Sequence, residues 1–125
     1  MWVSLVVAFA CLSVYETQAY RFGLLGGYSQ PECPTDEQQK MFSSMIQQSG
    51  QENGLSELDG SSTVDVLQVE MQIVQGTNYR GLVRVNDNDC YTVVIHEDLP
   101  NQYGSDGPYS ILGVNDAECS PEIDC

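Results

Sequence analysis

The chain has 125 residues, a length that allows one domain, and its 42% of hydrophobic residues are enough for a packed core. Its charge is strongly negative, because 18 acidic residues stand against only 4 basic ones, giving a net charge of −14. Binding to nucleic acid or to an anionic membrane surface requires clustered lysine and arginine. The basic residues are scattered along the chain, so we expect neither as a partner: Arg21, Lys40, Arg80 and Arg84.

An apolar run from Trp2 to Val14 opens the chain. This run is too short to span the roughly 30 Å hydrocarbon core of a bilayer. A polar stretch follows it and ends at Ala19, a small residue that suits the position before a signal-peptidase cut. A buried N-terminal helix or strand is the alternative interpretation. We expect residues 1–19 to be a signal peptide and residues 20–125 to form a secreted domain.

Cysteine content agrees with secretion. Cys11 belongs to the expected signal peptide, which leaves an even set of four: Cys33, Cys90, Cys119 and Cys125. An even set in a short secreted chain favours two disulfides. A zinc site is the alternative, but the sequence has no close Cys-x-x-Cys pair and only one histidine. We therefore expect no metal and no other cofactor.

One helix is predicted after the first prolines. Thr35, followed three residues later by Gln38, forms a capping box, which is typical of a helix start. Apolar residues then recur at helical spacing and form one stripe: Met41, Phe42, Met45 and Ile46. Gly50 and the Asn53–Gly54 pair end the pattern. We expect the stripe to pack against a sheet.

Alternating apolar residues predict four strands after the helix, over 64–73, 79–85, 91–96 and 109–114. In the first of these the alternation changes parity near Leu67, which indicates a β-bulge or a strong bend. Turns are predicted at Gly76–Asn78 and Asn86–Asp89, and a loop at Leu99–Pro108. The order predicts an α+β fold, a helix on one face of an antiparallel meander, with an acidic tail from about residue 115.

No catalytic arrangement emerges from the sequence. Cys90 and His96 are six residues apart on one predicted strand, or roughly 20 Å, whereas a base must lie within about 3 Å of its nucleophile. His96 is therefore interpreted as a solvated residue at a strand end. Asp87–Asp89 resembles the start of a calcium loop, but Thr92 stands where that loop requires glycine. A binding protein is favoured over an enzyme.

Three short motifs occur in order along the chain. The first is Leu24-Leu25-Gly26-Gly27, which we call the trunk. The second, which we call the first loop, is Gln72-Ile73-Val74-Gln75-Gly76. The third, the second loop, is Leu99-Pro100-Asn101. Together they resemble the cystatin superfamily, inhibitors of papain-like cysteine proteases, over about residues 24–114. The first loop matches the family's Gln-x-Val-x-Gly, and its continuation through Tyr79 is similar to the stefin branch.

The resemblance implies a cystatin-like fold, in which one helix packs on an antiparallel sheet of four to five strands. The trunk and the two loops would form a wedge that enters the cleft of a papain-like, cathepsin-type protease. Leu24 and Leu25 would occupy subsites on the acyl side, and Gly26 would let the chain turn away from the catalytic thiol. Such a protein would be a monomer that inhibits reversibly and without covalent chemistry. The alternative is a cystatin-fold module that binds another partner and does not inhibit.

The chain also departs from the family pattern. Secretion and disulfides resemble the secreted cystatins, whereas the loops resemble stefins, which usually lack both. Gln75 replaces a small residue in the first loop, and the second loop has no Pro-Trp pair. In a cystatin-like meander, the start of the third strand lies beside the end of the fourth, away from the wedge. The resemblance therefore implies a Cys90–Cys119 disulfide, which leaves Cys33–Cys125 as the second.

Overall fold

The computed structural model describes residues 27–102 and 107–125. The expected signal peptide and the trunk residues Leu24, Leu25 and Gly26 lie outside this range. The described elements are one helix, two short 3₁₀ helices and four strands, in the order α2 (Asp36–Ser49), η1 (Gln51–Asn53), β1 (Val64–Val74), β2 (Gly76–Val85), β3 (Asp89–Glu97), η2 (Pro100–Gln102) and β4 (Tyr109–Ala117). Within these residues, no helix has the length and apolar character needed to cross a membrane.

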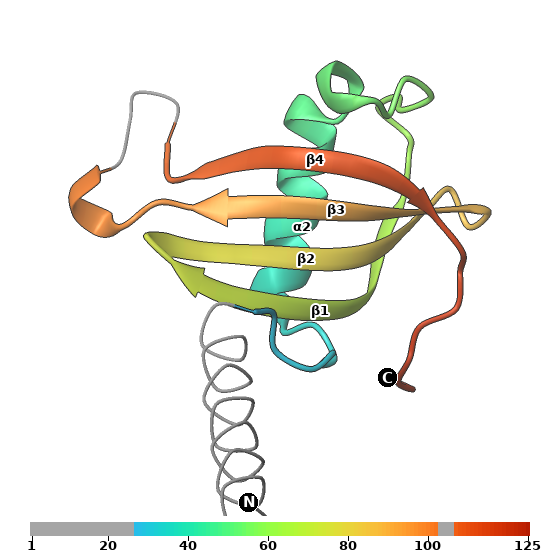
Figure 1. Cartoon of the computed structure of the whole chain (residues 1–125). Coiled ribbons are helices and arrows are strands. Elements are labelled where there is room, and N and C mark those ends of the chain that lie inside the picture. Colours follow the sequence, from blue (N-terminus) through green and yellow to red (C-terminus); the bar gives the residue numbers. More distant parts are fainter. Residues whose placement is uncertain (1–26, 103–106) are drawn as a thin grey trace, which may run out of the picture.

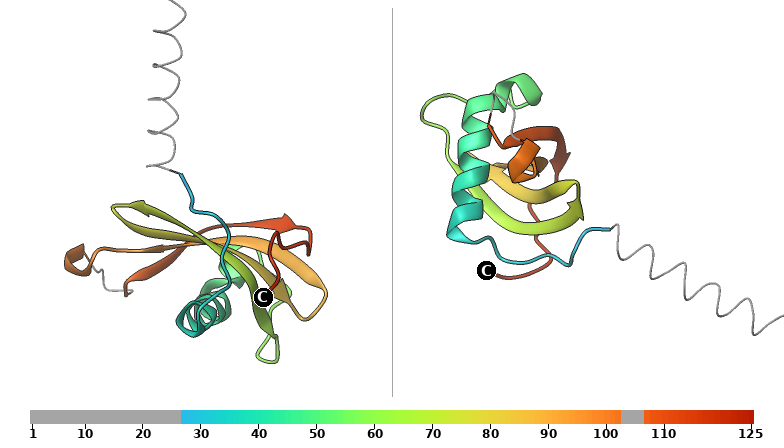
Figure 2. Two further views of the ribbon diagram at one scale, coloured as in Figure 1. Left: turned by 90° about the horizontal axis from the view of Figure 1, so that it is seen from below. Right: turned by 90° about the vertical axis from the view of Figure 1, so that its left-hand side faces the viewer.

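The four strands form one antiparallel sheet in the order β1-β2-β3-β4, and α2 crosses one face of it (Figures 1 and 2). A bridge between Glu32 and Val69 adds the beginning of a fifth strand beside β1. The predicted fold class, one helix packed on an antiparallel sheet of four to five strands, is confirmed. The other face of the sheet, which we call the outer face, carries no helix among the described elements (Figure 2).

Helix α2 begins at the predicted capping box. The backbone N–H of Gln38 donates to Oγ1 of Thr35 at 3.1 Å, and the N–H of Thr35 donates to Oε1 of Gln38 at 3.0 Å. Phe42 and Ile46 from the predicted stripe are fully buried, and the two methionines of the stripe pack around them. The helix ends at Gly50, whose N–H donates to the carbonyl oxygen of Ile46.

A glycine in the sheet sets how closely the helix approaches. A Cβ atom added to Gly81 on β2 would lie 2.6 Å from Cζ of Phe42, a distance that real Cβ contacts do not reach. The Phe42 ring therefore rests on the bare backbone of β2. The fully buried core around it comes from the helix and the two central strands: Phe42, Ile46, Val83, Val93 and Ile95.

The parity change in β1 is a β-bulge, as predicted. The pairing of β1 with β2 shifts between Val66 and Gln68, so Leu67 is the extra residue. Both Val66, before the bulge, and Val69, after it, are buried in the core. Because a bulge increases the local twist and bends its strand, β1 follows the curvature of the sheet around α2 (Figure 1).

Several strand boundaries differ from the prediction: β1 ends at Val74, and β3 spans Asp89–Glu97, so Asp89 is strand and not turn. The predicted turn at Gly76–Asn78 is wrong, because Thr77 and Asn78 belong to β2 and pair with Ile73 and Gln72. The chain reverses at Gln75 alone, since Gly76 adopts a φ of +93°, which glycine tolerates without strain. Strand β4 continues past the predicted end at Val114 to Ala117, because these polar residues still pair with β3.

One disulfide ties the chain after β4 to β3, and the other joins the segment before α2 to the C-terminal tail. Cys90 is bonded to Cys119 and Cys33 to Cys125, with Cα–Cα distances of 5.3 Å and 5.6 Å. These are the pairs that the resemblance implied. Between them the C-terminal tail returns from β4 toward the segment before α2 (Figure 2). On the way, the N–H of Glu122 donates to Oε1 of Gln68 on β1 at 2.7 Å.

Candidate functional site

The first and second loops lie at one end of the sheet, which we call the loop end (Figure 1). The first loop is the tip of the β1–β2 hairpin, and the second loop follows β3 directly. The first loop lies close to the end of β3, because a Cβ atom on Gly76 would collide with the backbone carbonyl oxygen of Glu97. Glycine at this position therefore permits both the tight reversal of the first loop and its approach to β3.

Apolar side chains are exposed at the loop end. Ile73 is 66% exposed, Val74 45% and Leu99 39%. Only one other large hydrophobic side chain among the described residues is comparably exposed, that of Leu112 on β4. Ile73 and Val74 are consecutive strand residues, so they project to opposite faces of the hairpin. Both faces of the tip could thus bury apolar surface against a partner, which stabilises a complex by about 25 cal/mol per Å².

The remaining loop residues are polar or conformationally restricted. Gln75 at the hairpin tip is exposed, as are Pro100 and Asn101 in η2. The second loop is closed at its base, where the N–H of Asp98 donates to the carbonyl oxygen of Pro108 at 2.8 Å. Gly27, the one described residue of the trunk, is also exposed.

A row of polar side chains crosses the sheet beneath the loops. Gln72, Asn78 and His96 are direct cross-strand partners on β1, β2 and β3. Asn78 Nδ2 donates to Gln72 Oε1 at 3.0 Å, and Asn78 Oδ1 lies 2.6 Å from His96 Nδ1. His96 Nε2 lies 3.2 Å from Oδ1 of Asp98, the residue before the second loop. This row links the bases of the two loops.

The prediction that His96 stands at a strand end is confirmed, whereas the prediction that it is solvated is wrong. Its side chain is only 19% exposed, because partners on β2 and at the end of β3 enclose it. The prediction that Cys90 and His96 form no catalytic pair agrees with the structure. They lie at opposite ends of β3, and Cys90 is bonded to Cys119.

On the helix side of the sheet, Tyr79 makes a second link between β2 and β3. Its Oη donates to Oε1 of Glu97 at 3.0 Å. Burial, the hydrogen bond to Glu97 and the negative charge of Glu97 together raise the pKa of Tyr79 to about 12. The phenol is therefore neutral at physiological pH and remains a donor. Both faces of the sheet are thus cross-linked just below the loop end.

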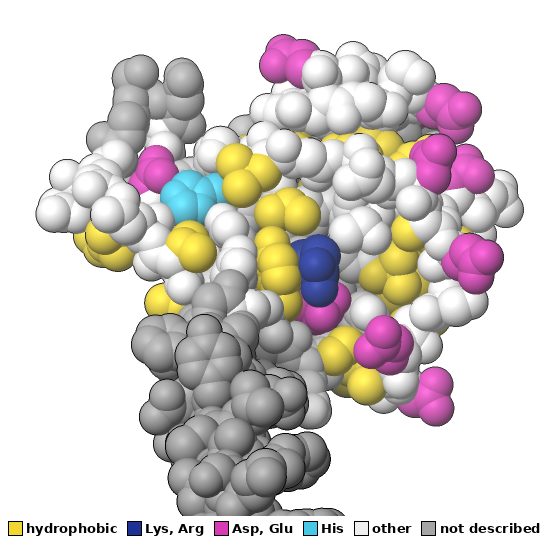
Figure 3. All heavy atoms as spheres, in the orientation of Figure 1, with side chains coloured by type: hydrophobic (Ala, Val, Ile, Leu, Met, Phe, Trp, Pro, Cys, Tyr) yellow, Lys and Arg dark blue, Asp and Glu magenta, His cyan; other side chains and the backbone are white. Residues whose placement is uncertain are grey.

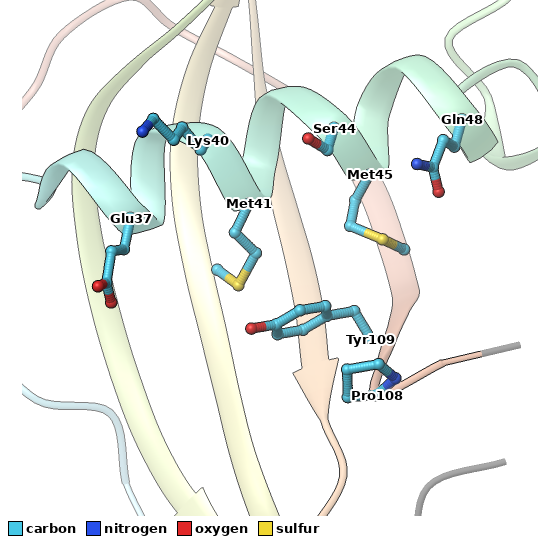
Figure 4. Close-up of a pocket in the computed structure, with 8 residues that line it drawn as sticks. All are labelled: Glu37, Lys40, Met41, Ser44, Met45, Gln48, Pro108 and Tyr109. Carbon is cyan, nitrogen blue, oxygen red and sulfur yellow. The ribbon is translucent and has the colours of Figure 1, made fainter.

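A shallow hollow of about 470 Å³ lies between α2 and the start of β4 (Figure 4). Two methionines and the Tyr109 ring supply its apolar walls, and Figure 4 shows Glu37 and Lys40 at one end of it. Among residues 27–102 and 107–125, no cluster of histidine, cysteine or acidic side chains could hold a metal ion. The loop end is therefore the stronger candidate for function.

Comparisons with known proteins agree with this geometry. No protein-family model and no curated protein matches the chain. Among solved structures, it is similar to a secreted type 1 cystatin from Fasciola hepatica, with a TM-score of 0.62 and 29% sequence identity. The match covers 76% of this chain and 99% of that protein. The chain is therefore a cystatin-like protein with the fold of the cystatin superfamily.

Proposed function

We propose that the chain is a secreted, reversible, tight-binding inhibitor of papain-like cysteine proteases of the cathepsin type. In this proposal the trunk and the two loops enter the active-site cleft of the protease and block it. The inhibitor acts as a monomer and is not an enzyme.

The observation that carries the proposal is the exposure of Ile73, Val74 and Leu99 at adjacent loop tips. Exposed apolar side chains that gather at one place on a soluble domain are typical of an interaction site. Here they belong to the two motifs that resemble the inhibitory loops of cystatins. The cystatin-like fold brings those motifs to the same end of the sheet.

The structure also supports a steric mode of inhibition. The first and second loops carry amide, aliphatic and proline side chains, none of which is a nucleophile at neutral pH. The hairpin tip is narrow, because Gln75 alone separates the paired residues Val74 and Gly76. A narrow and cross-linked tip loses little conformational entropy on binding, which favours affinity. Inhibition would thus come from occupying the cleft.

Secretion is supported by two observations. Both disulfides require an oxidising environment to form and persist. The similar protein from Fasciola hepatica is described as secreted. With the apolar run at Trp2–Val14, these observations favour removal of residues 1–19 and release of the remaining domain.

A titration tests the proposal. The domain from Tyr20 onward is added in increasing amounts to papain whose active sites have been counted. We expect a linear loss of activity that reaches completion near one inhibitor per active site. A serine protease such as trypsin, treated in the same way, should keep its activity. Full papain activity at a micromolar excess would contradict the proposal and favour the non-inhibitory binding module.

A further inference from the structure

The segment that follows the trunk is attached to the edge of β1. The N–H of Ser29 donates to the carbonyl oxygen of Met71 at 2.7 Å, and the N–H of Met71 donates to Ser29 Oγ at 3.0 Å. Glu32 and Val69 exchange two backbone hydrogen bonds of 2.9 Å. The segment thus runs antiparallel to β1. Following the segment backward from Glu32 to Gly27 therefore leads along β1 toward the first loop.

Tyr28 stacks on an arginine of the sheet. The guanidinium carbon of Arg80 lies 3.9 Å from the centroid of the Tyr28 ring, which is a cation–π contact. The chain makes this contact between residues that are far apart in sequence. On the outer face of the sheet, Figure 3 shows a basic side chain flanked by apolar ones, with acidic side chains mostly around the rim.

The arginine is itself held in place. Glu70 and Arg80 are direct cross-strand partners on β1 and β2. Nε of Arg80 donates to Oε1 of Glu70 at 3.2 Å, and Nη2 donates to Oε2 at 2.9 Å. A two-point ion pair fixes the plane of a guanidinium group as well as its position. Arg80 therefore presents a fixed flat surface to Tyr28.

Tyr28 directly follows the last glycine of the trunk. Two glycines, Gly26 and Gly27, stand directly before it, and glycine allows a wide range of backbone directions. Tyr28 is the first side chain after them that is attached to the sheet. The direction in which the trunk leaves the domain therefore depends on how firmly Tyr28 is held.

We propose that Tyr28 is a positioning residue, which the Arg80–Glu70 ion pair holds so that the trunk is directed toward the loop end. This inference rests on the proposed function, because it concerns the trunk's contribution to protease binding. A trunk that samples many directions binds more weakly, since its apparent affinity falls with the fraction of chains in the binding direction. The contact raises that fraction without touching the protease.

The experiment combines two substitutions with a truncation. Y28A and Y28F are made in the domain that starts at Tyr20 and in a shortened domain that starts at Gly26. Inhibition constants are measured with papain. In the longer domain we expect Y28A to weaken inhibition by roughly 3- to 10-fold. Y28F, which keeps the ring, should inhibit like the parent. In the shortened domain, which lacks the leucines, Y28A should change nothing.

Two further measurements separate positioning from general damage. L112A removes another exposed hydrophobic side chain, on β4, and should leave inhibition unchanged in both domains. Hydrogen exchange at the Ser29 amide, which donates to Met71, should be faster in Y28A than in Y28F. This second readout requires no protease.

The outcomes distinguish this inference from the proposed function. If the parent domain inhibits papain and Y28A inhibits equally well, the positioning role is wrong while the proposed function stands. An equal loss in the long and shortened domains would also overturn it, because the effect would not act through the trunk. A parent domain that leaves papain fully active removes the proposed function, and this inference with it.

Discussion

The two ends of the sheet are held together in different ways. At the loop end, hydrogen bonds between side chains join the strands, and Ile73, Val74 and Leu99 remain exposed. At the opposite end, the Cys90–Cys119 disulfide ties β3 to the chain just after β4. The tail then crosses to Cys33, where the second disulfide closes.

This difference separates binding from stability. Among the described residues, the largest fully buried side chains come from α2, β2 and β3, and none of them belongs to a loop of the candidate site. Substitutions at the loop tips should therefore alter binding with little effect on folding, and loss of a disulfide should do the reverse. The contrast between the ends can be tested by changing each separately.

The largest effect is expected from V74D. In the free chain Val74 is 45% exposed, so the carboxylate stays hydrated and the fold is retained. In a protease cleft the same carboxylate would be buried without a partner, at a cost of several kcal/mol, or a loss of affinity on the order of 10³-fold. Papain inhibition constants measure this loss, and circular dichroism checks the fold.

L112D is the matched control, because it adds the same charge at an exposed hydrophobic position on β4. It should inhibit like the parent. If V74D folds normally and also inhibits like the parent, the first loop is not a contact.

The next effect concerns stability alone. Replacing both cysteines of either disulfide by serine should lower the free energy of unfolding by about 2–4 kcal/mol. The loss should be greater for Cys33–Cys125, which spans 92 residues, than for Cys90–Cys119, which spans 29, because closing a longer loop removes more entropy from the unfolded chain. Denaturant unfolding of the two double variants measures both values.

The same disulfide variants should also be tested for inhibition of papain. Cys90 and Cys119 lie at the end of the sheet opposite the loops, so the variant without this disulfide should keep the parent's inhibition constant while folded. A large loss of inhibition at a temperature where the variant is folded would show that the two ends are coupled.

A smaller effect is expected from the trunk. Burial of a leucine side chain contributes about 1.5–3 kcal/mol. A domain that starts at Gly26 lacks Leu24 and Leu25, and it should inhibit roughly 10²-fold more weakly. The difference should appear mainly as faster dissociation, which stopped-flow displacement measures. Equal dissociation rates for the long and shortened domains would mean that the trunk does not bind.

Local features of the fold were predictable from the sequence, because neighbouring residues determine them. The capping box at Thr35 and Gln38 fixes the start of α2, and the parity change at Leu67 marks the bulge in β1. The tight reversal at Gln75 was missed, because Gly-Thr-Asn has the composition of a turn. Only the pairing of Thr77 and Asn78 with β1 shows that these residues are strand.

Contacts between distant residues could not be predicted in this way. His96 reads as a solvated residue until strand pairing places Asn78 beside it. The stacking of Tyr28 on Arg80 depends on the path of the segment along β1, for which the sequence has no local signal. The binding role of the loop motifs was predicted only through the family resemblance. Hydrophobic periodicity predicts strands and turns, but it does not show which molecule a turn binds.

The smallest effect expected is a pH dependence of stability from Tyr79, whose hydrogen bond to Glu97 joins β2 and β3 below the loop end. Burial, followed by the interactions with Glu97, raises the pKa of Tyr79 from 10.0 to about 12 in the folded chain. A raised pKa means that folding favours the protonated phenol. Its contribution is therefore complete below pH 10 and is lost as the pH rises from about 10 to about 12. Because the side chain is partly solvated, we expect this contribution to the free energy of unfolding to be about 1 kcal/mol or less.

Unfolding measured at pH 9 and at pH 11.5 should show a smaller fall in stability for Y79F than for the parent, since phenylalanine has no proton to lose. An equal fall in the two proteins would assign the alkaline loss to other groups, such as Tyr91, whose pKa burial also raises.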